Sequence, residues 1–381
     1  MGALSTRVGF KRNGGRADGC GGAGVGSVTG NGGGNDLPVG AASRKRGASR
    51  ARKASVLAVL AVVAVVAFLL SATLGRYDMD LGRVLSLIAG AFTGQATGAD
   101  ANVFFTIRLP RIVAALIVGA ALSGAGCAFQ GIFKNPMVSP DLLGASAGAC
   151  FGAALGILLS FGGVGMEVCA FAMGIIAVAA SYALSSVIGR RMGGVLVLVL
   201  SGLVVGNLFQ AFTSGVKFLA DPNSQLPEIT FWLMGGLSAV RENDLAALVA
   251  AFVVGTAGLF ALRWRINVMS LGDDEARSLG VDVRRTRLAV IAFATLLTSA
   301  SVAVAGMVGW VGLIVPHLAR FLVGSDQRTL LPASMLLGGT FLLVVDDVCR
   351  SIYTTEIPLS ILTAIIGAPL FVYLICRQRR A

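Results

Sequence analysis

The stretch RLPRIVAALIVGAALSGAGCAFQGIFKNPMVSPDLLGASAGA, residues 108–149, joins two apolar runs through one short polar break. The first run, Ile112–Phe133, carries no charged residue, and about 20 apolar residues cross a bilayer as a helix. Its glycine, alanine and serine residues suit helices that pack closely in lipid. Asn135-Pro136 and Pro140 end this helix. The stretch therefore predicts a membrane-spanning helix, a sharp turn and a second helix.

The rest of the chain has the same character. It is 55% hydrophobic and only 13% charged, against about 25% charged residues in soluble domains, and its mean hydropathy is +0.82. These values predict an all-α polytopic membrane protein with about ten transmembrane helices. The expected spans are 54–74, 110–132, 141–161, 165–188, 195–219, 243–263, 287–308, 310–323, 330–350 and 358–376.

The positions of the basic residues predict the topology. Ten of the 31 Lys and Arg residues precede residue 54, and fourteen more lie in loops that are cytoplasmic if the N-terminus is inside. Seven remain for the other side, which satisfies the positive-inside rule with both termini in the cytoplasm. Because both termini are then on the same side of the membrane, the number of spans must be even. Eight spans would satisfy this condition as well as ten.

Residues 1–53 are predicted to be a disordered, basic cytoplasmic tail, because they are rich in Gly, Ser and Arg and lack hydrophobic periodicity. The run 54–74 is long enough to span, so we expect it to stay attached as a first helix. GCGGAG at 19–24 matches a dinucleotide-binding pattern but has no strand before it and no helix after it. A basic tail beside a membrane fixes topology and contacts anionic lipid, and we expect no nucleic-acid partner.

A second informative loop is WRINVMSLGDDEARSLGVDVRRTR, residues 264–287. It is longer than the ~2–8 residues of most helix–helix connections. Acidic residues begin a short helix at Asp273–Leu279 and an arginine follows, which suits the helix dipole. Gly272 and Gly280 stand where helix caps belong. We predict a short amphipathic helix on the inner membrane surface that receives a soluble partner; the alternative is a solvated connector.

The sequence gives no sign of a metal site. Its one histidine, His317, has no Cys, Asp or Glu at ligand spacing, and we interpret it as a structural residue at the inner end of a short helix. The six cysteines are scattered without a C-x-x-C pair, so neither a disulfide framework nor a zinc site is predicted.

Five segments, in order along the chain, resemble the FecCD-type permeases of ABC importers, which take up iron–siderophores, haem and cobalamin. They are residues 108–149, LGDDEARSLGV (271–281), GLIVPHLAR (312–320), DDVCR (346–350) and EIPLSILTAIIGAPLF (356–371). The resemblance runs from about residue 56 to the end. It implies a type II ABC importer fold and makes 54–381 a transmembrane permease domain of the cell inner (cytoplasmic) membrane, with 264–287 as its coupling loop.

The resemblance also implies partners. Two permease subunits, identical or different, would surround a pathway, cytoplasmic ABC ATPases would drive them, and an extracytoplasmic binding protein would deliver the substrate. Positions that match arginines receiving acidic residues of the binding protein are Arg108, Arg111 and Arg350, all placed outside by the charge count. The alternative is that Arg108 and Arg111 snorkel at a helix end and that Arg350 pairs with Asp346 or Asp347.

Three further groups of residues match functional positions of the family. The cytoplasmic gate would include Asn135 and Met137, although a plain proline turn is the alternative. The coupling helix that contacts the ATPase would use Gly272, Glu275, Ala276 and Gly280. A short outer helix at the entrance would lie within 224–239 and present Trp232 and Gly235-Gly236. We expect the fifth and second spans to line the pathway, with Asn207, Gln210 and Ser214 as its polar positions.

The expected function is the import of a ferric siderophore, with haem or cobalamin as alternatives. No G-x-x-x-x-G-K-[ST] loop occurs, so the chain is expected to be no enzyme, to bind no cofactor and to leave ATP hydrolysis to a partner. The lightly polar lining suits a bulky chelate better than a bare ion. A rival, an ion-coupled secondary transporter, would need ionisable groups near mid-membrane, where the spans have few. A lipid-binding structural protein would leave loop 264–287 unexplained.

Overall fold

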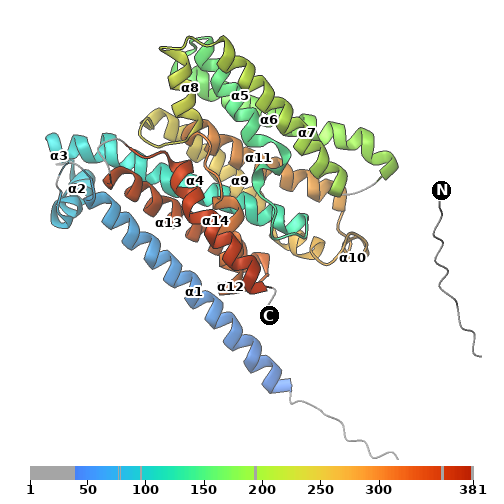
Figure 1. Ribbon diagram of the computed structural model, residues 1–381. Helices are drawn as coiled ribbons and strands as arrows, with labels where there is room; N and C mark the ends of the chain where they lie inside the picture. Colours follow the sequence, from blue (N-terminus) through green and yellow to red (C-terminus); the bar gives the residue numbers. More distant parts are fainter. Residues whose placement is uncertain are drawn as a thin grey trace, which may run out of the picture. The chain divides into compact units, whose positions relative to one another are not determined.

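The computed structural model describes residues 39–75, 77, 79–94, 97–192, 195–352 and 356–378, and within them all regular structure is helical (Figure 1). The helices are α1 (Val39–Thr73), α2 (Leu81–Thr93), α3 (Ala99–Asn102), η1 (Val103–Arg108), α4 (Leu109–Ile132), η2 (Pro140–Leu143), α5 (Ala145–Leu158), α6 (Gly162–Met192), α7 (Val195–Leu219), α8 (Gln225–Leu233), α9 (Glu242–Met269), α10 (Asp273–Ser278), α11 (Val283–Ala305), α12 (Val311–Val323), α13 (Gln327–Ser351) and α14 (Leu359–Gln378). The predicted all-α class is confirmed.

All ten predicted spans fall on helices. Within the described residues, seven helical segments are long and apolar enough to cross a membrane: Ala51–Thr73, Ala99–Ile132, Gly162–Ile188, Leu196–Leu219, Glu242–Met269, Val283–Ala305 and Gln327–Ser351. The other three predicted spans correspond to the shorter apolar helices α5, α12 and α14. The predicted span 141–161 is divided into η2 and α5, because Gly144 adopts a left-handed conformation between them.

Two boundaries differ from the sequence-based expectation. Helix α1 begins at Val39, before the predicted start at residue 54, so the last part of the tail is helical where disorder was expected. The rest of the predicted tail, residues 1–38, lies outside the described residues. No helix was predicted between the first two spans, and this segment holds α2, α3 and η1. A 13-residue amphipathic helix such as α2 is too short to register as a span.

Helix α4 is the central element of the unit formed by residues 49–381. It packs against α9, α11, α12 and α13, as Figure 1 shows for the α4–α13 pair, and most of its side chains are buried. Glycines make this packing possible: a Cβ on Gly119 would lie 2.2 Å from the carbonyl oxygen of Gly338 on α13, and one on Gly126 would lie 1.7 Å from that of Gly312 on α12. Small residues thus let backbones meet directly.

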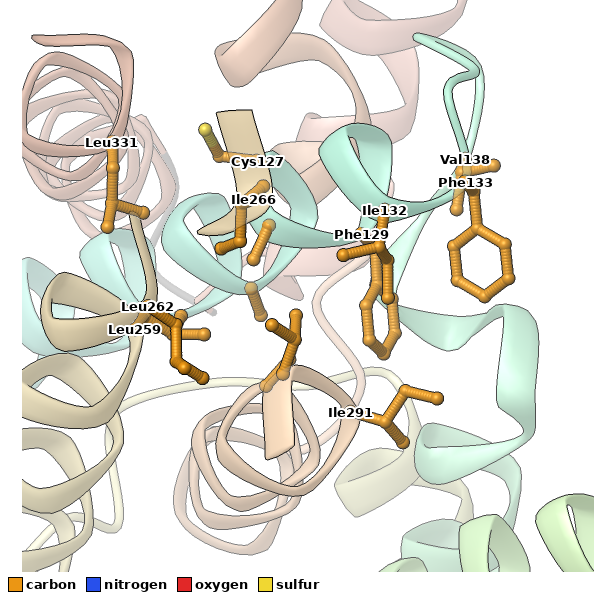
Figure 2. Packing of buried hydrophobic residues seen from close by; sticks show 14 of the residues in the cluster. Cys127, Phe129, Ile132, Phe133, Val138, Leu259, Leu262, Ile266, Ile291 and Leu331 are labelled. Atoms are coloured by element: carbon orange, nitrogen blue, oxygen red, sulfur yellow. The ribbon is translucent and has the colours of Figure 1, made fainter. Parts of the chain in front are cut away.

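The buried core continues to the C-terminal end of α4. Figure 2 shows Phe129 and Ile132 of α4 pointing toward the helix that carries Ile291, with Ile266 of α9 beside them. Phe129, Ile132 and Ile266 are fully buried. This apolar cluster holds the end of α4 against α9 and α11.

The bundle has an α8 end and an α10 end. The α8 end contains α8, the first turn of α4, the C-termini of α11 and α13, and the segment before α14, because residues of all of these line one cavity. The α10 end contains α10, the loop after α4 and the first turn of α11, which are joined by ion pairs. The charge count predicts that the α8 end is outside and the α10 end is inside.

Candidate functional site

A cavity of about 1120 Å³ lies at the α8 end. Trp232, Gly235 and Gly236, predicted from the sequence to stand at an entrance, all line it. Its charged lining among the described residues is mostly acidic, with five carboxylates, from Glu167, Glu228, Asp244, Asp346 and Glu356, and two guanidinium groups, from Arg111 and Arg241. A cavity lined mainly by one sign of charge concentrates ligands of the opposite sign and repels those of the same sign.

Arg111 is the central charge of this cavity. Its Nε and Nη2 atoms donate to the two carboxylate oxygens of Asp346 at 2.9 and 2.8 Å, and its Nη1 atom donates to Glu356 at 2.8 Å. The Arg111 side chain is 12% exposed and that of Asp346 only 1%. Such a two-point guanidinium–carboxylate contact fixes both position and orientation. It ties α4 to α13 and to the segment before α14.

The other two arginines proposed for docking are also bonded within the chain; Arg108 is buried and Arg350 is half-buried. Arg108 donates to the carbonyl oxygens of Ala72 and Tyr77, at the C-terminal end of α1 and just beyond it. Arg350 pairs with Asp347 at 2.5 Å and donates to the carbonyl oxygen of Ser71 at 2.7 Å. The Arg350–Asp347 pair is one of the two arrangements that sequence analysis offered as the alternative to docking. Contact with a binding protein stays a prediction for all three arginines.

Helix α7 carries the three polar residues that were expected to line a pathway. Asn207, Gln210 and Ser214 are all exposed, and their spacing places them on one stripe of the helix. Leu196, Leu200 and Leu203 continue that stripe and are also exposed. Helix α4, by contrast, is enclosed within the chain. The expectation that the second span lines a pathway alongside the fifth is therefore wrong for most of its length.

Helix α10 has one buried and one exposed side. Of the residues proposed for coupling, Gly272 and Ala276 are buried while Glu275 and Gly280 are exposed. Ala276 packs into the same apolar cluster as the end of α4. Leu271 and Leu279, at either end of α10, are 67% and 56% exposed. Uncovered leucines beside a short charged helix are suited to contact a partner protein.

The loop after α4 lies next to α10. Asn135 and Met137, the proposed gate residues, are exposed, and the Asn135 side chain accepts a hydrogen bond from the backbone N–H of Met137 at 2.9 Å. His317 lies on α12, where it is buried and meets the ring of Phe321 edge-on at 5.2 Å. It does not belong to the exposed surface of α10.

Sequence reasoning missed the residues that connect these groups. Glu356 and the acidic lining around it were not singled out, and neither were Lys134 and Asp273, which form an ion pair between the α4 loop and α10. The partners are distant in the chain and share no short motif. Only the charge of Lys134, next to the Asn-Pro turn, gave a local signal.

Comparison with known proteins gives a consistent picture. A family model described as the FecCD transport family matches residues 63–377. The molybdate import system permease protein MolB of Haemophilus influenzae is 38% identical, over 82% of this chain and 92% of its own length. The cobalamin import system permease protein BtuC of Halobacterium salinarum is 43% identical, over 71% of this chain and 72% of its own.

A solved structure agrees with these relatives. It is described as an inward-facing metal-chelate type ABC transporter, is 37% identical in sequence, and superposes with a TM-score of 0.77 over 85% of this chain and 99% of its own. The chain therefore has the type II importer permease fold. Because the family model and these relatives cover most of the sequence, the chain belongs to the FecCD transport family.

Proposed function

We propose that this chain forms the pathway by which a neutral or cationic ferric chelate enters the cell. As a member of the FecCD transport family it is a permease subunit of an ABC importer, and therefore a transport component, not an enzyme. The acidic cavity at the α8 end is the observation that carries the substrate assignment, because its size and its charge each exclude some candidates.

The volume of the cavity favours a large substrate. At about 1120 Å³ it is slightly larger than the ~300–1,000 Å³ typical of sites for drug-sized ligands. A bare oxyanion such as molybdate, the substrate named for MolB, needs a small site with converging donors. The cavity instead presents an excess of carboxylates, which repel an oxyanion.

The negative charge of the cavity lining also distinguishes between the larger candidate substrates. Haem carries two propionates and ferric tricatecholates are anionic, so the acidic lining opposes both. A neutral or cationic ferric trihydroxamate meets no such repulsion. Cobalamin is also without net charge and remains the second candidate, supported by the 43% identity to a cobalamin permease.

The remaining features of the proposal concern assembly. We assign the polar stripe of α7 to a pathway between two permease subunits, because exposed amide groups are costly in lipid and gain from a wet or protein-covered surface. Helix α10, with its exposed leucines, would contact an ABC ATPase. An extracytoplasmic binding protein would dock at the α8 end, where Arg108, Arg111 and Arg350 lie. The basic N-terminal side would be cytoplasmic, as would the C-terminus, and the chain would need no cofactor of its own.

The test is uptake by the assembled permease and ATPase in liposomes, with the binding protein supplied outside. We expect ATP-dependent uptake of a cationic or neutral ferric trihydroxamate, and little uptake of a ferric tricatecholate, haem or molybdate at equal concentration. Orthovanadate should stop this uptake and a protonophore should not. Uptake that survives orthovanadate but collapses with the protonophore would favour an ion-coupled transporter, and preferred uptake of cobalamin would replace the iron assignment.

A further inference from the structure

An ion-paired bridge connects three elements at the α10 end. The carboxylate of Asp273, the first residue of α10, lies 3.4 Å from the ammonium group of Lys134 in the loop after α4. The same carboxylate accepts two hydrogen bonds from Nη2 of Arg287 on α11, at 2.8 and 3.1 Å. Asp273 is thus the point where α10 meets both the α4 loop and α11.

The backbone at Lys134 is unusual for a lysine. Helix α4 ends in a Schellman motif, in which the N–H of Asn135 bonds to the carbonyl of Gln130 and that of Lys134 bonds to Gly131. Lys134 occupies the left-handed position of this motif, with φ of +52°, where glycine is the favoured residue.

Helix α10 ends in the same motif, and there the left-handed position is occupied by the usual residue. There the N–H of Val281 bonds to the carbonyl of Ala276 and that of Gly280 to Arg277, and glycine holds the left-handed position with φ of +78°. The backbone alone would favour glycine at residue 134 as well. Unlike glycine, lysine at this position has a side chain that reaches Asp273.

The bridge lies between the proposed gate residues and the helix that faces a partner. Lys134 directly precedes Asn135 and Met137, the proposed gate residues, while Asp273 sits on the helix that exposes Leu271 and Leu279 to a partner. The apolar cluster of Figure 2 includes Phe133 just before Lys134 and Val138 just after Met137, so residues 134–137 form a short turn between two anchored points. A displacement of α10 would reach the loop through this contact.

The bridge is charged but contributes little to folding. Burial raises the pKa of Asp273, but the ion pairs with Arg287 and Lys134 outweigh burial and hold that pKa below its ordinary value. The carboxylate is therefore ionised at neutral pH. The side chains of Lys134 and Asp273 are 37% and 34% exposed, and ion pairs that solvent reaches add little stability. Removing the Lys134 half of the bridge should therefore leave the fold intact.

We propose that Lys134 and Asp273 are positioning residues that transmit the movement of α10 to the gate loop, with Arg287 holding the Asp273 carboxylate in place. This inference rests on the proposed function, since it assumes that α10 contacts an ATPase and that the loop after α4 gates the pathway. It adds the specific contact that connects the two.

The test compares variants in liposomes that contain permease and ATPase. Met137→Cys is labelled with a membrane-impermeant thiol reagent, with nucleotide absent and with the ATPase trapped by orthovanadate, and ATP hydrolysis is measured in the same sample. Lys134→Gln, Asp273→Asn and the double variant remove the bridge, and Lys134→Arg keeps it. Arg285→Gln is the matched control, because it removes the basic half of an exposed ion pair with Asp282 on neighbouring α11.

We expect the labelling rate to differ between the two nucleotide states at least about fivefold in the parent and in Lys134→Arg, in line with ordinary coupling between sites. Lys134→Gln and Asp273→Asn should abolish that difference while ATP hydrolysis stays within twofold. The double variant should behave like either single one. Arg285→Gln should respond as the parent does.

A nucleotide response that persists in Lys134→Gln would overturn the inference, and so would an equal loss in Arg285→Gln. The labelling readout does not depend on the identity of the substrate. If no ferric chelate is taken up but the response is lost only in the bridge variants, the inference stands and the substrate assignment fails.

Discussion

Asp346 and Asp347 are neighbours on α13, yet they bind different arginines on different sides. Asp346 holds Arg111 of α4, whereas Asp347 holds Arg350 and accepts a hydrogen bond from the hydroxyl of Ser71 on α1. Successive residues of a helix point about 100° apart, so two adjacent carboxylates reach two separate neighbours. The pair therefore joins α1, α4 and α13 at the α8 end.

Breaking the Arg111–Asp346 pair should destabilise the protein strongly. Arg111→Ala leaves the Asp346 carboxylate buried without its main partner, and removing one half of a buried pair costs about 3–5 kcal/mol. Thermal unfolding of the purified protein in detergent measures the loss. Arg83→Ala is the control, because the Arg83–Asp100 pair is solvent-exposed and such pairs are worth about 0–1 kcal/mol. Equal shifts in the two variants would contradict the structural role of Arg111.

A methyl group at Gly126 should disrupt the contact between α4 and α12. The added Cβ would lie 1.7 Å from a backbone oxygen of Gly312, which has no flexible side chain to move away. Overpacking costs about 1–3 kcal/mol even where some relaxation occurs, so we expect Gly126→Ala to lower the amount of folded protein in the membrane.

Gly82→Ala is the matched control for that variant. Gly82 lies inside α2, and among the described residues an added Cβ would meet only the Asp80 side chain, at an ordinary contact distance of 3.5 Å. Replacing glycine by alanine in a helix with room for the methyl group is stabilising by about 0.4–1 kcal/mol. Similar abundance of both variants, measured by quantitative immunoblot of membranes, would rule out the close packing described for Gly126.

Acid should weaken the contact between the end of α9 and the start of α13 through Asp326. This residue caps α13 by accepting from the N–H of Arg328, and its carboxylate also accepts from the amide of Asn267 at 2.7 Å. Burial raises the pKa of Asp326, but these hydrogen bonds and nearby positive charge outweigh burial and lower that pKa below 3.8. A carboxylate with a lowered folded-state pKa stabilises fully above its ordinary pKa and loses that contribution as pH falls through the folded value.

The stabilisation from Asp326 should therefore be constant from pH 7 to 5 and decline only below about pH 4. Asp326→Asn keeps a capping oxygen but cannot be protonated in this range, so its stability curve should be flatter in acid. Unfolding midpoints measured from pH 7 to 3.5 compare the two proteins. If both lost stability with the same steepness below pH 4, Asp326 would have no part in the acid response.

The helices were largely predictable from sequence, because uncharged runs and Gly/Pro breaks are local signals. All ten expected spans fall on helices, and the short helix at 273–279 is present as α10. The amphipathic α2 was missed because its apolar residues occupy one side of a helix too short to span. The early start of α1 was missed because a Gly/Arg-rich composition concealed it.

The site was predictable in its residues but not in its pairings. Arg111 and Asp346 were both singled out, yet nothing local shows that α4 brings the first onto the second across 235 positions. Lys134 and Asp273 were not singled out, and nothing local shows that they pair either. Long-range ion pairs depend on which helices pack together, and glycine contacts such as Gly119–Gly338 determine that packing only in three dimensions.

Cysteine labelling along α7 should separate a wet stripe from a lipid-facing one. Asn207, Gln210 and Ser214 lie on one stripe, while Phe212 and Leu219 lie nearly half a turn away and are also exposed. If the polar stripe faces a pathway, single cysteines at 207, 210 and 214 should react with a hydrophilic thiol reagent in the assembled importer. Cysteines at 212 and 219 should react at least about tenfold more slowly, because a thiol in hydrocarbon stays protonated and the thiolate is the reactive form.

The native cysteines make this measurement practical. Cys127, Cys150 and Cys349 are buried, and Cys376 is exposed, so replacing Cys376 by serine lowers the background. Bound substrate should slow the reaction at 207, 210 and 214 and leave 212 and 219 unchanged, since only the wet stripe is then covered. Equal reactivity at all five positions would mean that water reaches the whole exposed side of α7, and the pathway could not be assigned to the polar stripe.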